Sequence, residues 1–157
     1  MCATGLVLVD ANGEAGRVRA LACADLRDGP PALEAVTVET KRYALTDALD
    51  DLTDAGDQIE RLAVAGFVPS AAADLPCDYH HAWIGGGKRL PRRLLEADAE
   101  RGAALPKGHL HLCKSGGPGL MIDATPGILD LVGGPLREGH RRTWRGVIES
   151  VTAVSRR

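Results

Sequence analysis

The segment GHLHLCKSGGPGLMIDAT, residues 108–125, contains the side chains of this chain that are best suited to chemistry. Its HLHLC stretch alternates polar residues with leucines, a pattern typical of a β-strand that has one buried face. In a strand, His109, His111 and Cys113 share one face, while the leucines form the opposite, core face. The pattern therefore predicts two imidazoles and a thiol on one accessible surface.

The GLMIDAT stretch that follows predicts a second strand, which forms a β-hairpin with the first over residues 109–124. If residues 114–118 form the loop, Asp123 lies opposite His109, with the two Cβ atoms about 4.5–5.5 Å apart. A carboxylate in this position would hold the imidazole in one tautomer and favour its protonated form. A register slip of one residue would move Asp123 to the other face of the hairpin.

The histidines and cysteines cluster in two short windows. Four of the five histidines lie in CDYHH at 77–81 and HLHLC at 109–113, and each window also contains a cysteine. An imidazole beside a thiol can take its proton and produce a nucleophilic thiolate, and a carboxylate behind the imidazole completes the arrangement. The clustering predicts a functional site that involves both windows.

Residues 109–127 resemble the transglutaminase-like and papain-like superfamily, in which a histidine opens one strand and an aspartate closes the next. The resemblance implies the family's catalytic roles for His109 and Asp123. It also implies a nucleophilic cysteine upstream, and Cys77 is the cysteine at a plausible distance. The expected function is then a small thiol-dependent hydrolase or acyltransferase, which acts without a cofactor on an amide or thioester in a small-molecule or peptide substrate.

A metal site is the alternative use of the same two windows. Cys-x2-His-His followed by His-x-His-x-Cys offers up to six ligands, whereas tetrahedral zinc needs three or four. The candidate ligands for zinc or another divalent metal are His80, His81, His111 and Cys113. A closed site of this kind would make the protein a non-catalytic module with a structural metal.

Residues 79–113 also resemble the HNH nucleases of the colicin type. This resemblance implies His81 as the general base, His80 and His109 as metal ligands, and Cys113 in place of the family's last histidine. It implies metal-assisted hydrolysis of a phosphodiester, with nucleic acid as the partner. Basic residues outnumber acidic ones between 78 and 114, and such a patch attracts phosphates.

The composition is that of one globular domain, residues 1–157. The chain has 45% hydrophobic residues, enough for a core, and a net charge of −2, which gives no general argument for nucleic acid or an anionic membrane. It contains no apolar run of membrane-spanning length and no recognisable leader, so we expect no membrane partner and a cytoplasmic location, with reduced thiols.

Hydrophobic patterns predict the elements that would position these residues. Apolar residues at helical spacing predict a helix over 46–65 and a shorter one over 91–102, while the region 67–90 reads as irregular. Strands are expected within 4–26 and 32–43, in the hairpin, and over 145–155. The predicted fold is α+β, a mainly antiparallel sheet packed with about two helices in a single domain.

Overall fold

The computed structural model describes residues 3–140, and within them all regular secondary structure is helical. The elements are α1 (Glu14–Asp28), α2 (Ala35–Asp54), α3 (Gln58–Tyr79), α4 (Leu90–Ala97), α5 (Ala99–Ser115) and α6 (Gly119–Leu129), with 3₁₀ turns at Gly87–Arg89 and Asp130–Val132. Residues 3–140 contain no β-strand. The predicted α+β fold with an antiparallel sheet is therefore wrong.

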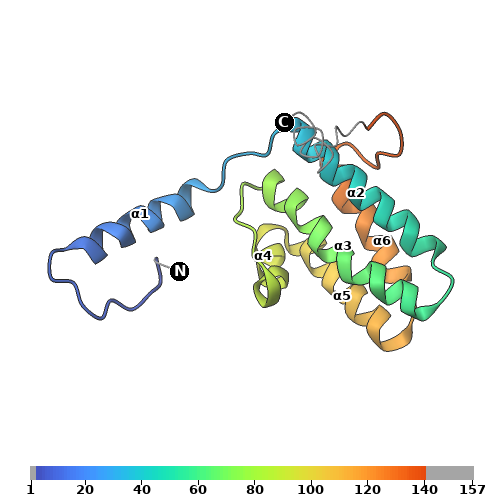
Figure 1. Cartoon of the computed structure of the whole chain (residues 1–157), viewed down its shortest axis with the longest axis horizontal. Coiled ribbons are helices and arrows are strands. Elements are labelled where there is room, and N and C mark those ends of the chain that lie inside the picture. The colour runs from blue at the N-terminus through green and yellow to red at the C-terminus, as the bar shows by residue number, and fades with distance from the viewer. Residues whose placement is uncertain (1–2, 141–157) are drawn as a thin grey trace, which may run out of the picture.

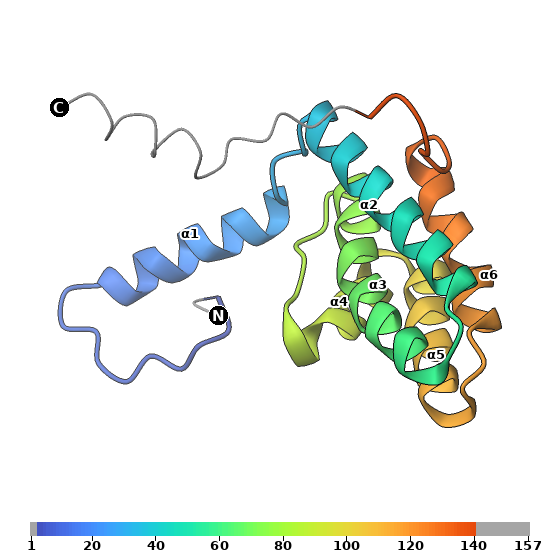
Figure 2. The same cartoon turned by 45° about the vertical axis from the view of Figure 1, so that its right-hand side comes forward.

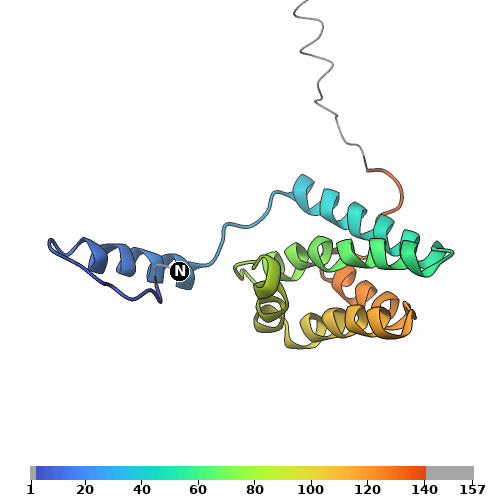
Figure 3. The same cartoon turned by 60° about the horizontal axis from the view of Figure 1, so that its bottom comes forward.

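Four helices, α2, α3, α5 and α6, pack into a bundle around one core (Figure 1). Helices α2 and α5 lie on opposite sides of this bundle, and α3 packs against both of them (Figure 3). The short helix α4 packs against α3 and α5. The core consists mainly of aliphatic side chains, among them Leu45, Leu52, Val68, Leu75, Leu105, Leu112, Met121, Ile128 and Leu129.

The predicted hairpin is in fact the pair of helices α5 and α6. Leu112 is fully buried, whereas Leu110, which a strand would place on the same face, is 54% exposed. Buried residues of α5 recur at Leu105, Gly108 and Leu112, the spacing of one face of a helix. The segment 114–118, expected to form the hairpin loop, contains the end of α5 instead, because Gly116 adopts a left-handed conformation with φ of +75°.

The predicted helix limits are also corrected. The region 46–65 is divided between α2 and α3 at residues 55–57. There Asp57 accepts hydrogen bonds from two backbone N–H groups of the first turn of α3, at 2.7 and 3.0 Å, and so caps that helix. Helix α3 then continues to Tyr79, through a region expected to be irregular, because its buried face holds it in the bundle in spite of two internal prolines.

Residues 3–28 form an N-terminal arm that lies beside the bundle rather than within it (Figure 2). The predicted strands in this region are wrong, since its regular element is α1, and α1 contains no buried residue. The arm is attached near its end, where the indole nitrogen of Trp83 donates a hydrogen bond to the Asp25 carbonyl at 3.1 Å. The strand predicted over 145–155 lies outside the described residues.

We therefore predict that deleting residues 1–28 changes the free energy of unfolding by less than about 1 kcal/mol, since the arm contributes no buried side chain from α1. Urea denaturation followed by circular dichroism at 222 nm measures this for both proteins. A loss of about 3 kcal/mol or more would show that the arm is part of the cooperative fold.

Candidate functional site

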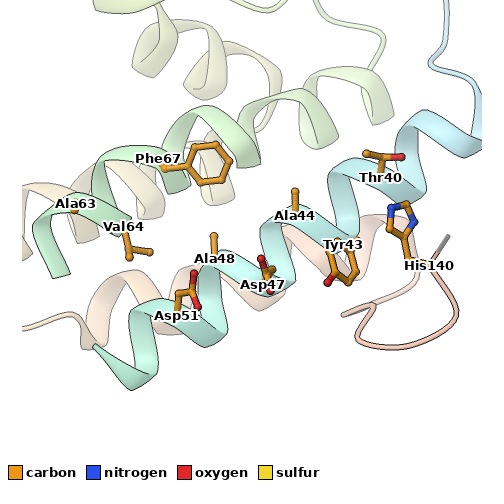
Figure 4. A pocket seen from close by; sticks show the side chains of 10 residues that line it. All are labelled: Thr40, Tyr43, Ala44, Asp47, Ala48, Asp51, Ala63, Val64, Phe67 and His140. Atoms are coloured by element: carbon orange, nitrogen blue, oxygen red, sulfur yellow. The ribbon is translucent and has the colours of Figure 1, made fainter. Parts of the chain in front are cut away.

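A groove of about 670 Å³ lies between α2 and α3, and we treat it as the candidate site (Figure 4). From α2, Ala44 and Ala48 point toward α3, and their small side chains leave the space that forms the groove. Phe67 of α3 lines the same space and is 53% exposed. The full lining is Thr40, Tyr43, Ala44, Asp47, Ala48, Asp51, Ala63, Val64, Phe67 and His140.

The charged side chains of the groove are all negative. Asp47 and Asp51 lie four residues apart on α2, so they occupy neighbouring positions on one face of the helix, and both are exposed. The lining residues include no lysine or arginine. The groove thus combines an apolar surface with two carboxylates.

One end of the groove is closed by the chain that follows α6. The guanidinium of Arg42 donates hydrogen bonds to three successive carbonyl groups within 133–135, and Thr46 accepts one from the backbone N–H of Leu136 at 3.0 Å. These bonds hold the segment against α2. They bring His140 onto Tyr43, where the two rings stack with their centroids 4.8 Å apart.

Sequence reasoning missed this groove. The pattern that predicts a helix over 46–65 places Asp47 and Asp51 near the N-terminus of that helix, where anions are favoured, and assigns them no ligand. In the structure these residues lie in the C-terminal half of α2, which runs from Ala35 to Asp54. The sequence does contain a pattern that indicates the groove. Ala44 and Ala48 each lie three residues before one of the two aspartates, so small and acidic residues lie side by side along one helix.

His109 and Cys113 do lie together, although for a different reason from the one predicted. They are four residues apart on α5, and Cys113 Sγ lies 3.7 Å from His109 Nε2. His109 Nδ1 lies 3.0 Å from the carbonyl oxygen of Ala65 on α3. A carbonyl only accepts, so Nδ1 carries the hydrogen and Nε2 accepts the S–H of Cys113. His111, two residues along, is turned about 200° around the helix and belongs to another face.

The structure places Cys77 far from this pair. Cys77 lies on α3 and is 3% exposed. Burial raises the pKa of its thiol, and the negative charge of Asp74 raises this pKa further, whereas the positive charge of Arg93 lowers it. His109 contacts Ala65, which is twelve residues before Cys77 on α3, so the two sites are separated by about 18 Å along the helix.

Asp123 is exposed and does not complete a triad with His109. On α6, the buried Met121 packs against Gly108 of α5, so this face of α6 is the one turned toward α5. Asp123 follows two residues later and is about 200° further around the helix. The cross-strand pair of His109 and Asp123 depended on the hairpin, and two helices do not reproduce it.

The other histidine window lies at the opposite end of α5. His80 Nε2 is 3.3 Å from the Asp98 carboxylate, which caps the first turn of α5, while His81 is exposed beyond the end of α3. Asp98 is eleven residues from His109, about 16 Å along the helix. Among residues 3–140 no three potential metal-ligating side chains gather into one group, so the predicted ligands are not brought together there.

Residues 3–140 form an all-helical fold with an open acidic groove on its surface. No family model matches the chain, and no curated protein or solved structure matches it either. The two family resemblances suggested by the sequence, and with them the expected hydrolase and zinc chemistry, therefore gain no support from known proteins. Within residues 3–140, none of the helices combines the length and apolar character needed to cross a bilayer.

Proposed function

We propose that this protein is a docking module whose α2–α3 groove binds an amphipathic, positively charged helical segment of a partner protein. The observation that carries this proposal is the lining of the groove, which offers an apolar surface and two carboxylates without a lysine or arginine. The predicted acyl-transfer reaction has no comparable support, because Cys77, His109 and Asp123 do not form one site. A cytoplasmic location remains part of the proposal.

The dimensions of the groove favour a helix as the occupant. Its lining on α2 extends from Thr40 to Asp51, which is about 17 Å along the helix axis, or three turns. A partner helix of similar length could place its apolar side chains against Phe67 and Val64, in the manner of other helix-in-groove complexes.

The electrostatics favour a cationic occupant. Two carboxylates four residues apart on one helix repel each other by about 0.2–0.5 kcal/mol. Lysine or arginine side chains of a ligand would remove this repulsion between Asp47 and Asp51 and would add their own attraction to both. Because both aspartates are exposed, the attraction is expected to weaken as the salt concentration rises.

Two synthetic peptides of about 14 residues test this proposal by fluorescence anisotropy. Both place leucine on one helix face, and the other face carries lysine in the first peptide and glutamate in the second. We expect the lysine peptide to bind at least about tenfold more tightly, and we expect Asp47→Asn with Asp51→Asn to weaken its binding about five- to tenfold. Raising the salt from about 50 to 500 mM should reduce this difference.

The matched control is Asp123→Asn with Asp130→Asn, which removes the same charge from exposed positions outside the groove. This variant should bind the lysine peptide as the unmodified protein does. An equal loss in both double variants would reveal general charge attraction and would contradict the proposal, as would equal affinity for the two peptides. Sedimentation velocity over a range of concentrations shows whether a second copy of the chain occupies the groove instead.

A further inference from the structure

We propose that Cys113 is a redox modification site, at which His109 acts as the base that prepares the thiol for attack on a hydroperoxide. This inference is independent of the groove, because neither residue lines it. It rests on the hydrogen bond between the two side chains, on the orientation of the imidazole, and on the exposure of Cys113.

The first requirement is access, and the described cysteines differ in it. Cys113 is exposed, Cys23 is partly exposed and Cys77 is buried. None of the three forms a disulfide. Among them, Cys113 is the most exposed residue, and it alone of the three hydrogen-bonds to an imidazole.

The second requirement is a base in the correct tautomer. The Ala65 carbonyl accepts the Nδ1 hydrogen of His109 at 3.0 Å, which leaves the Nε2 lone pair directed at the sulfur, 3.7 Å away. A thiol is activated as a nucleophile when a base lies beside it and a third group orients that base. Here a backbone carbonyl of α3 orients the base, and Ala65 is fully buried, so its position is fixed by the core.

The position on α5 explains why the base is needed. Cys113 lies in the last turn of α5, so the positive end of this helix is remote from the sulfur and does not assist the loss of its proton. The imidazole provides this assistance, because it takes the proton as the sulfur reacts, and no long-lived thiolate is required.

The reaction balances with a hydroperoxide as the oxidant. The sulfur attacks the distal peroxide oxygen, the S–O bond forms and the O–O bond breaks, while the thiol proton passes through His109 to the leaving oxygen as water or an alcohol. The sulfur is oxidised to a sulfenic acid and the peroxide is reduced. A low-molecular-weight thiol then condenses with the sulfenic acid to form a mixed disulfide and releases water.

The first experiment uses the unmodified full chain. It is treated with hydrogen peroxide, the sulfenic acid is trapped with a selective carbon nucleophile, and mass spectrometry of the peptides measures the rate at each cysteine. We expect Cys113 to be labelled at least about tenfold faster than Cys23, with Cys77 the slowest. Addition of glutathione should convert the oxidised Cys113 to a mixed disulfide. Equal rates at Cys113 and Cys23 would overturn the proposal, and this comparison needs no variant.

The second experiment identifies the base. Glutamine in His109→Gln can still donate to the Ala65 carbonyl but cannot take a proton, so we expect the oxidation of Cys113 to slow about tenfold while that of Cys23 is unchanged. His111→Gln makes the same change on another face of α5 and should leave the rate as it was. An unaltered Cys113 rate in a folded His109→Gln protein would exclude His109 as the base.

Discussion

Gly102→Ala is expected to destabilise the protein by about 3 kcal/mol or more, because α4 and α5 touch at this residue. A Cβ atom at Gly102 would lie 2.2 Å from the carbonyl oxygen and 2.4 Å from the carbonyl carbon of Leu94. Both are backbone atoms of α4, and Leu94 is 1% exposed, so the overlap is relieved only when the two helices separate. Urea denaturation measured by circular dichroism gives the change in the free energy of unfolding.

Gly66→Ala is the matched control for this variant. Gly66 lies inside α3, it is exposed, and a Cβ atom there would have no neighbouring atom within 4 Å. Alanine should therefore stabilise the helix by about 0.5–1 kcal/mol through its higher helix propensity. If Gly102→Ala were as stable as Gly66→Ala, the close packing of α4 on α5 would be refuted.

Asp98→Ala is expected to cost about 2–3 kcal/mol near neutral pH, because the buried Asp98 carboxylate combines a helix cap with an ion pair to the partly exposed Arg101. Its carboxylate accepts hydrogen bonds from the backbone N–H of Arg101 at 2.9 Å and from the Arg101 guanidinium at 3.0 Å, and it lies 3.3 Å from His80 Nε2. The side chain is 7% exposed, so water does not replace these partners. Thermal or urea unfolding of both proteins provides the measurement.

The pH dependence of this loss distinguishes a charged carboxylate from a space-filling side chain. Burial alone would raise the pKa of Asp98, but the hydrogen bonds from Arg101 and His80 and the charge of Arg101 lower it below its ordinary value. A carboxyl group whose pKa is lower in the folded state stabilises the protein above its unfolded-state pKa, and this contribution disappears as the pH falls. The difference between the unmodified protein and Asp98→Ala should therefore be full at about pH 7 and shrink below about pH 4.

Asp123→Ala is the control for the pH series, since Asp123 is exposed on α6. It should change the free energy of unfolding by less than about 0.5 kcal/mol at each pH. A loss in Asp98→Ala that stays constant down to about pH 3 would contradict the role of the charged form.

Part of the helical structure was predictable from the sequence. Leu45, Leu49 and Leu52 recur at helical spacing, and all three are buried in α2 as the pattern predicts. Extended to Ile59, the same spacing predicts a buried side chain, and this prediction is wrong because Ile59 is 80% exposed. It failed there because α3 is a separate helix, capped by Asp57, with its own buried face.

The HLHLC segment shows why the rest of the fold was not predictable. Five alternating residues fit a strand, but they also fit a helix in which Leu112 faces the core and Leu110 faces outward. Packing against α3 and α6 decides between these conformations, and such contacts come from residues distant in the sequence. The choice also changes the site, since residues four apart are about 13 Å apart in a strand and about 6 Å apart in a helix.

The identity of the reactive side chains and the four-residue spacing of His109 and Cys113 follow directly from the amino-acid sequence. The packing of α5 against α3 makes these two residues a pair in which Ala65 orients the imidazole. Tertiary structure also separated Cys77 and His80 from them by the length of a helix, and it created the groove by bringing α2 beside α3. The physical reason is that local spacing specifies neighbours along one element, whereas the burial of apolar faces specifies which elements meet.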